Sequence, residues 1–129
     1  VKDEDGPIRY SFRASRYDYL RIAKAILDDW QNDTCVGKYL KTIHERRIYK
    51  NNKWKDDNSH NLNSKSYAGH FHTNYSGISS KKRNVMGMNG YGGQSIMIDF
   101  DKGRINVINS MHRNYNWKKI AHSVIKKGK

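Results

Sequence analysis

Apolar residues recur at helical spacing in the first third of the chain. Four of them lie three or four positions apart: Leu20, Ala23, Leu27 and Trp30. Ile22 and Ile26 widen this stripe. The stripe is preceded by Ser15, with Asp18 three residues later, which is typical of a capping box at a helix N-terminus. The pattern therefore predicts a helix over about residues 16–30.

Two less regular segments follow that helix. A weaker apolar periodicity predicts a second helix over about residues 36–48. Residues 50–66 are rich in Asn, Lys, Asp and Ser, a composition that predicts an exposed connection. We expect residues 1–129 to belong to one domain, in which this connection separates the helical part from the segments that follow.

The second half of the chain combines strand patterns with a final helix. Three segments have the alternating or clustered apolar residues of strands: 67–75, 94–100 and 104–110. A tight turn at 101–103 joins the last two, and a glycine-dense segment at 87–93 precedes them. Asn114 or Asn116 is expected to cap a terminal helix. Its apolar positions are Trp117, Ile120, Ala121, Val124 and Ile125. This order predicts an α+β fold, with antiparallel strands flanked by helices and a C-terminal packing helix.

Charge is the strongest signal in the composition. The 129 residues carry a formal net charge of +13, from 25 Lys and Arg against 12 Asp and Glu. Such a charge is typical of proteins that bind nucleic acid or another polyanion. Abundant Lys and Asn are also typical of chains encoded by AT-rich genomes, and the basic residues are spread along the sequence without a docking motif. Nucleic-acid binding is therefore disfavoured, and a small basic module that binds nucleic acid or another polyanion is kept as an alternative function.

Cysteine content, hydropathy and histidine spacing bear on other classes of site. The single cysteine, Cys35, excludes an intrachain disulfide and a cysteine zinc cluster. No stretch approaches the roughly 18 consecutive apolar residues of a membrane span, so none is expected. His70 and His72 would share one face of a strand, a spacing able to hold a metal, but no third ligand is fixed near them. The sequence therefore predicts no metal and no other cofactor.

The sequence of residues 90–99, followed by a hairpin and a helix, resembles the family of class C β-lactamases, penicillin-binding proteins and related esterases. Three further segments agree in order and spacing. They are Ser15–Ile22, which resembles the family's Ser-x-x-Asp-hydrophobic helix, Tyr67–Phe71, which resembles its aromatic strand, and Gly103–Ser110 with Asn114–Asn116, which resembles its last strand and the start of its terminal helix. The resemblance spans most of this chain but only the C-terminal part of the family's domain.

The resemblance implies which residues would form a site. In that family a Ser-x-x-Lys helix supplies the nucleophile and its activating amine, and a Lys-Thr-Gly or His-x-Gly motif lies on an edge strand facing the serine. Met88, Asn89 and Gly90 occupy the position of that edge motif, and the N–H of Tyr91 would be the oxyanion donor. The remaining substrate-binding positions implied are Gly92, Gly93 and Gln94, with His70 and His72 lining the groove.

Met88 departs from the family pattern because it is neither Lys nor His. A cationic anchor for a substrate carboxylate is therefore missing, which favours an esterase or amidase over recognition of β-lactams or peptide carboxylates. The string Ser-x-x-Lys does occur at Ser79–Lys82 and at Ser123–Lys126, but the first is predicted in a polar loop and the second near the end of the terminal helix. Neither is predicted to be a nucleophile, since this chemistry needs a rigid, desolvated Ser–Lys pair.

The resemblance thus predicts the C-terminal fragment of a serine hydrolase that acts by acyl-enzyme chemistry. The substrate is expected to be a small-molecule ester or amide, and the missing N-terminal portion of the same domain would bring the nucleophile. The chain alone is expected to be inactive and to expose a sheet edge and an apolar helix face. A catalytically degenerate hydrolase-like domain is the remaining alternative. An extracytoplasmic or periplasmic location is implied by the resemblance only.

Overall fold

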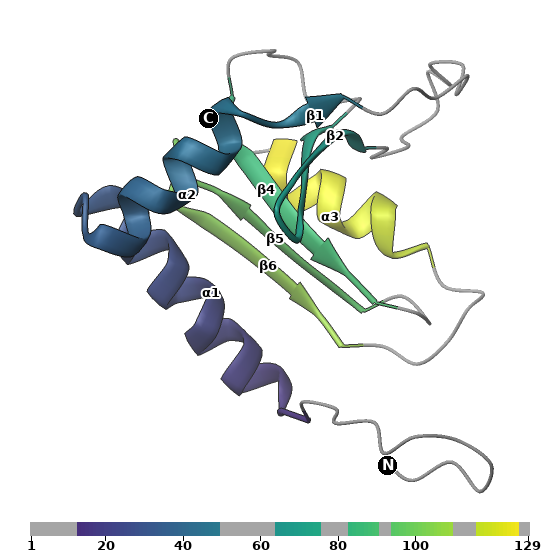
Figure 1. Ribbon diagram of the computed structural model, residues 1–129. Helices are drawn as coiled ribbons and strands as arrows, with labels where there is room; N and C mark the ends of the chain where they lie inside the picture. Colours follow the sequence, from purple (N-terminus) through teal and green to yellow (C-terminus); the bar gives the residue numbers. More distant parts are fainter. Residues whose placement is uncertain (1–12, 50–63, 76–82, 91–93, 110–115, 127–129) are drawn as a thin grey trace, which may run out of the picture.

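A computed structural model describes residues 13–49, 64–75, 83–90, 94–109 and 116–126. Two helices come first, then a six-stranded antiparallel sheet, then a third helix (Figure 1). The elements are α1 (Arg16–Gln31), α2 (Cys35–Glu45), β1 (Ile48–Tyr49), β2 (Ser64–Ala68), β3 (Phe71–Tyr75), β4 (Val85–Asn89), β5 (Ser95–Asp99), β6 (Arg104–Ile108) and α3 (Trp117–Lys126). The strands lie in the sheet in their sequence order, β1 to β6. The predicted α+β class and the C-terminal helix are confirmed.

The first predicted helix is confirmed as α1, and its capping box forms as expected. The Ser15 Oγ accepts a hydrogen bond from the Asp18 N–H at 3.2 Å, and the Asp18 carboxylate accepts one from the Ser15 N–H at 3.0 Å. The Ser15 hydroxyl also donates to the Asp18 carboxylate at 2.7 Å, and this bond, together with the one from the Ser15 N–H, holds the pKa of the Asp18 carboxyl below its usual range. The two orphan N–H groups satisfied in this way determine where the helix begins.

The second predicted helix is confirmed in its body but not at its end. It begins at Cys35, whose side chain is exposed, and ends at Glu45. Ile48, predicted as its last apolar residue, instead begins β1 and pairs with Tyr67 of β2. The backbone groups of Ile48 are therefore used in a sheet that forms across about 20 residues of sequence, a contact that local periodicity does not encode.

The predicted strand at 67–75 is wrong, because the chain reverses in its middle. Gly69 adopts a left-handed conformation with φ of +60°, and a turn at residues 69–70 joins β2 to β3. His70 therefore lies in the turn and does not share a strand face with His72. The predicted connection at 50–66 also ends earlier than expected, since residues 64–66 belong to β2, and the remainder of that connection lies outside the described residues.

The hairpin of β5 and β6 is confirmed, with Gly103 at φ of +64° in its turn. The segment at 87–93 was predicted as a glycine-dense turn, but its first three residues belong to β4, where Gly87 pairs with Met97. Residues 91–93 lie outside the described residues. Gly90 and Gln94 flank the described end of the β4–β5 hairpin, where the Gly90 N–H donates to the Gln94 carbonyl at 2.9 Å.

Two hydrophobic clusters bury opposite faces of the sheet. Alternate residues of β4 and β5, such as Met86 and Ile98, join the cluster beneath α1 and α2. Val85 and Met97 point to the other face and join the cluster beneath α3. All five residues of β5 are buried as a result. The sheet is therefore the middle of three layers, with α1 and α2 on one side and α3 on the other (Figure 1).

β3 contributes to both clusters although its side chains should alternate regularly. Phe71 packs against the α1 and α2 cluster, whereas Tyr75, four residues later, lies in the α3 cluster. Asn74 between them has a φ of +57°. This local irregularity reverses the face to which the following residue points. Thr73 stays on the first face, where its hydroxyl lies 2.5 Å from that of Ser66.

A buried ion pair joins the sheet to α3. Asp99 of β5 is fully buried and accepts hydrogen bonds from the Arg83 guanidinium, one of them from Nε at 2.8 Å. The same guanidinium donates to the Ile125 carbonyl of α3 at 2.6 Å. The second oxygen of Asp99 accepts from the backbone N–H groups of Asp101 and Lys102, each at 3.1 Å. One carboxylate therefore accepts hydrogen bonds from the backbone of the turn after β5 and from the guanidinium that anchors α3.

We predict that Asp99→Asn lowers the free energy of unfolding by about 3–5 kcal/mol, because the Arg83 charge stays buried without its counter-charge. The matched control is Asp28→Asn, which breaks the exposed pair with Lys24 and should cost less than about 1 kcal/mol. Urea unfolding followed by circular dichroism measures both. Equal losses in the two variants would show that the buried pair does not hold the layers together.

Candidate functional site

A pocket of about 360 Å³ lies between α1 and the ends of three strands. The α1 wall is formed by Tyr19 and Ile22. The sheet supplies the end of β4, the start of β5 and the end of β6. Its lining residues are Met88, Asn89, Gly90, Gln94, Ser95, Ile96, Val107, Ile108 and Asn109. Tyr19 also packs against the core cluster beneath α1, so the pocket lies at the margin of that cluster.

Four of the residues predicted from the sequence meet at this pocket. Met88, Asn89, Gly90 and Gln94 all line it. Tyr91, Gly92 and Gly93, which belong to the same predicted site, lie outside the described residues. The strand ends and the hairpin that carry the four residues are thus brought to one place.

The two predicted histidines are not among the residues that line the pocket. His72 lies on β3, opposite Gly87 of β4 in the sheet register. Its Nδ1 is 3.0 Å from the Ser64 Oγ, and its ring meets the Tyr67 ring edge-on with centroids 5.1 Å apart. These contacts hold His72 against β2. His70 is exposed in the preceding turn, so the two imidazoles are not combined into one site.

Hydrogen bonds at the pocket rim fix the positions of its polar groups. The Ser95 hydroxyl donates to the Asn89 Oδ1 at 3.2 Å, which holds the amide of Asn89 across the hairpin. The Gly90 N–H is committed to the Gln94 carbonyl. The Gly90 N–H is therefore used within the hairpin and is not directed at the pocket.

Tyr19, Ile22 and the end of β6 were not predicted as site residues. Ile22 lies on the helical stripe that was assigned to the core, whereas Tyr19 was not assigned to that stripe, and periodicity alone does not separate a core face from a pocket wall. The signal that distinguishes them is the width of the stripe. Ala23 and Leu27 fill the core, whereas Ile22 on the widened edge remains 38% exposed.

The lining side chains of the described pocket are apolar, amide or hydroxyl groups, and none of them is a Lys, Arg, Asp, Glu or His. The described residues also contain no group of three or more His, Cys, Asp or Glu positioned to hold a metal ion. The buried carboxylate of Asp99 is bonded to the Arg83 guanidinium. Within the described part of the chain, the pocket is therefore suited to uncharged organic groups.

The two Ser-x-x-Lys strings do not supply a nucleophile to this pocket from the described residues. Ser123 and Lys126 lie on α3, which packs on the opposite face of the sheet from α1, and the Lys126 side chain is exposed. Ser79 and Lys82 lie outside the described residues. The pocket presents binding groups, and its chemistry depends on what else reaches it.

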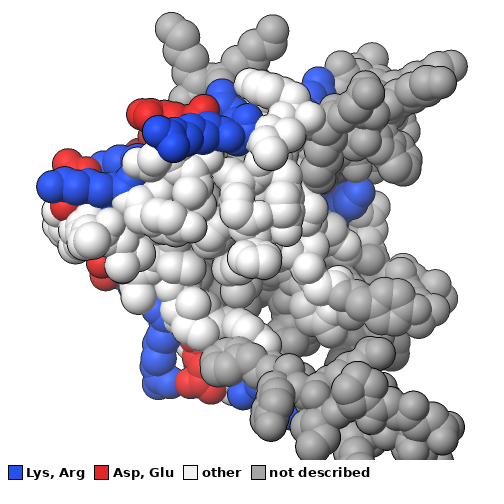
Figure 2. Space-filling view, viewed as in Figure 1, with Lys and Arg blue, Asp and Glu red and all other residues white. Residues whose placement is uncertain are grey.

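Basic residues do not gather into a stripe on the face shown in Figure 2. Lys and Arg lie around the edge of that face, close to Asp and Glu, and the centre is uncharged (Figure 2). Several described cations are held in ion pairs: Lys24 with Asp28, Arg21 with Asp18, and Lys41 with Asp33. On this face, the described residues therefore do not form the continuous basic surface that a polyanion-binding module requires.

Comparisons with protein-family models, curated proteins and solved structures gave no match to this chain. None of the helices in the described part of the chain combines the length and apolar character needed to cross a membrane. The function is therefore inferred from the residues and geometry of the pocket.

Two glycines of β4 and its hairpin provide a matched pair of substitutions. A Cβ at Gly87 would lie 2.2 Å from the buried Tyr75 hydroxyl and 3.0 Å from the Ile96 carbonyl oxygen. The three nearest atoms given for a Cβ at Gly90 all belong to the Gln94 side chain, the closest being its Oε1 at 3.0 Å.

We predict that Gly87→Ala lowers the free energy of unfolding by about 1–3 kcal/mol through overpacking, although alanine is otherwise preferred to glycine in a strand. Gly90→Ala should change it by no more than about 0.5 kcal/mol, because the Gln94 side chain can move. Thermal and urea unfolding of both variants measure the difference. A neutral Gly87→Ala would mean that Tyr75 does not pack over β4 as described.

Proposed function

We propose that this chain forms one wall of the active site of a serine hydrolase that acts by acyl-enzyme chemistry on small, uncharged esters or amides. A segment N-terminal to it in the same polypeptide would supply the serine and its activating lysine. The observation that carries the proposal is the convergence of Met88, Asn89, Gly90 and Gln94 on one largely apolar pocket at the end of the sheet. Ligand sites are typically apolar pockets with a few convergent polar groups.

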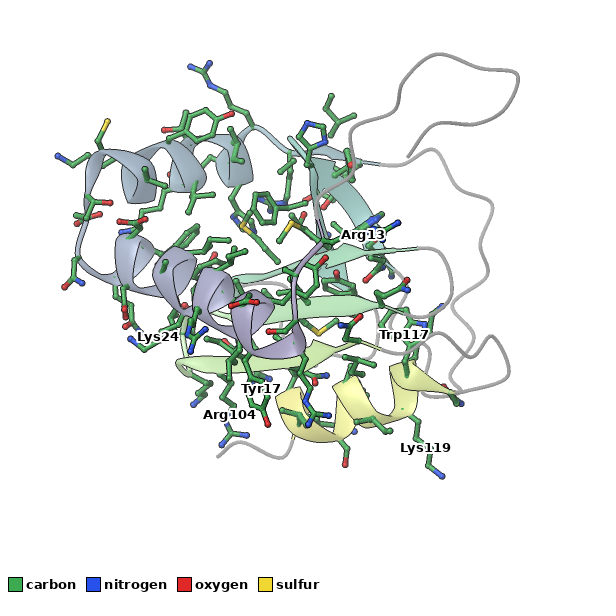
Figure 3. All side chains as sticks on the ribbon, turned by 90° about the horizontal axis from the view of Figure 1, so that it is seen from below. Arg13, Tyr17, Lys24, Arg104, Trp117 and Lys119 are labelled. Carbon is green, nitrogen blue, oxygen red and sulfur yellow. The ribbon has the colours of Figure 1, made fainter. Side chains whose placement is uncertain are left out.

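The outer edge of the described sheet, at β6, supports the proposed incompleteness of the domain. β6 is the last strand of the described sheet, and both α1 and α3 pack against it. Apolar residues of both helices remain exposed, including Tyr17 at 59% and Ile120 at 41%. Figure 3 shows α1 and α3 on opposite sides of the sheet, with Tyr17 and Arg104 near β6. An edge strand flanked by exposed apolar side chains favours addition of a further strand with its own covering residues.

The pocket chemistry supports the choice of substrate. Met88 places a thioether where the family has a cation, and the other described lining residues are also uncharged. A carboxylate-bearing substrate would be desolvated there without a counter-charge, which is costly. An uncharged ester or amide avoids that cost. Backbone N–H donation from Tyr91 to the developing oxyanion would then stabilise the tetrahedral intermediate.

The first test is reaction with a fluorophosphonate probe, followed by intact mass and peptide mapping. The 129-residue chain alone should give no adduct, because neither Ser-x-x-Lys string is expected to form a nucleophile. The polypeptide extended upstream through its reading frame should give one stoichiometric adduct on the serine of a Ser-x-x-Lys sequence. An adduct at Ser79 or Ser123 would overturn the proposal. An unreactive extended polypeptide that is folded would instead identify a degenerate hydrolase-like domain.

The second test concerns the oxyanion donor in the extended polypeptide. Tyr91→Pro removes the backbone N–H and should slow ester hydrolysis by about 10²–10³-fold. Tyr91→Phe retains the N–H and should leave the rate within about twofold of the parent. Initial rates with a short-chain nitrophenyl ester, together with circular dichroism of each variant, give the comparison. Equal rates for the Pro and Phe variants would remove Tyr91 from the proposed mechanism.

A further inference from the structure

We propose that the pocket between α1 and the strand ends binds the unbranched hydrocarbon chain of an uncharged acyl compound, and that Tyr19 and Ile22 determine the chain length it accepts. The assignment of this compound as the substrate rests on the proposed function. Its binding to the pocket does not, and that binding is measurable on the 129-residue chain.

The walls of the pocket have the character that a hydrocarbon chain requires. Tyr19 and Ile22 contribute one side, and the opposite side includes Met88, Ile96 and Val107. Ile22 is 38% exposed, so its apolar surface remains in contact with water when the pocket is empty. Burial of an alkyl chain against these residues removes apolar surface of both partners from water, which is the main driving force for such binding.

The polar groups of the pocket are placed for a carbonyl head group. Asn89, Gln94, Ser95 and Asn109 lie at the strand ends, and α1 contributes the apolar wall. The Asn89 Oδ1 already accepts from the Ser95 hydroxyl. The amide nitrogen of Asn89 is then the group of that side chain suited to donate to a ligand carbonyl. A ligand with its carbonyl at the β4–β5 hairpin and its chain along α1 uses both parts of the lining.

The size of the pocket limits the ligand to a short or medium chain. Its volume of about 360 Å³ lies at the lower end of the range of about 300–1,000 Å³ for small-molecule sites. The absence of a charged side chain among the described lining residues disfavours fatty-acid anions and alkylammonium ions, because each charge would be desolvated without a partner. A neutral amide or ester therefore fits better than either ion.

In the test, the 129-residue chain is titrated with butanamide, hexanamide and octanamide. Binding is measured by isothermal titration calorimetry and by the NMR chemical shifts of the backbone amides. Each added methylene should lower the dissociation constant about fourfold until the pocket is filled. Successive amides of this series differ by two methylenes, so their dissociation constants should differ about 15-fold. Octanoate and octylammonium, measured at high salt to suppress the effect of the net charge, should each bind at least about tenfold more weakly than octanamide.

Two tryptophan variants locate the binding site. Ile22→Trp places a larger side chain in the pocket wall and should weaken octanamide binding by at least about tenfold. The matched control is Val36→Trp, at an apolar position of α2 that is 50% exposed and does not line the pocket. It should leave the affinity unchanged. Tyr19→Ala enlarges the pocket and should shift the tightest binding to a longer amide. Unfolding curves verify that each variant is folded.

Three results would overturn the inference. The first is an affinity that does not depend on chain length. The second is equal binding by the Ile22→Trp and Val36→Trp variants. The third is self-association that Ile22→Trp abolishes and octanamide does not compete with, since the pocket would then bind a second copy of the chain. Sedimentation velocity with and without octanamide detects the third.

Failure of this inference is distinguishable from failure of the proposed function. Chain-length-dependent binding of amides, combined with an extended polypeptide that does not react with fluorophosphonate, would remove the hydrolase and leave the binding site. A reactive extended polypeptide whose ester hydrolysis is independent of acyl length would retain the hydrolase and remove the role of Tyr19 and Ile22.

Discussion

The buried pair of Arg83 and Asp99 is the interaction on which the arrangement of the layers depends. It lies where β4 begins and β5 ends, and Arg83 extends from there to a carbonyl at the C-terminal end of α3. The helix end has unsatisfied carbonyls and a partial negative charge, so a guanidinium is well suited to it. Arg104 donates to the neighbouring Val124 carbonyl at 3.0 Å. The segment just before β4 and the strand β6 therefore both anchor the C-terminal end of α3. The pair of Arg83 and Asp99 also fixes the register of β4 against β5 at one end of these strands. That register positions Met88 and Asn89 at the other end.

α1 has two roles that its sequence does not separate. Its C-terminal half belongs to the core, where Trp30 stacks on Phe100 with ring centroids 4.2 Å apart. Its N-terminal half forms the pocket wall. The change occurs near Ala23, which is fully buried. The pocket wall thus belongs to a helix whose other half is anchored in the core, and a site supported in this way can keep its shape without a ligand.

Features encoded locally were predictable from the sequence. The capping box at Ser15, the hairpin of β5 and β6 and the cap of α3 at Asn116, whose Oδ1 accepts from the Lys119 N–H at 3.2 Å, all depend on residues a few positions apart. The reversal at Gly69 and the change of face at Asn74 were missed, because their φ values follow from strand pairing. For the site, the resemblance pointed to four residues of the β4–β5 hairpin that line one pocket, and their role there stays a prediction. Tyr19 and Ile22 were not predicted, since a pocket wall depends on which strand residues lie opposite the helix in the folded chain.

The order of the strands has a consequence for how the chain folds. Every described strand pairs with its neighbour in sequence, so the sheet consists of successive hairpins. Such contacts require little loop closure, and topologies rich in them fold faster than those built on distant pairings. The bond from Arg83 to Ile125 spans 42 residues and depends on the return of α3 across the finished sheet. The slowest step of folding is therefore expected to be the docking of α3, with the hairpins formed before it.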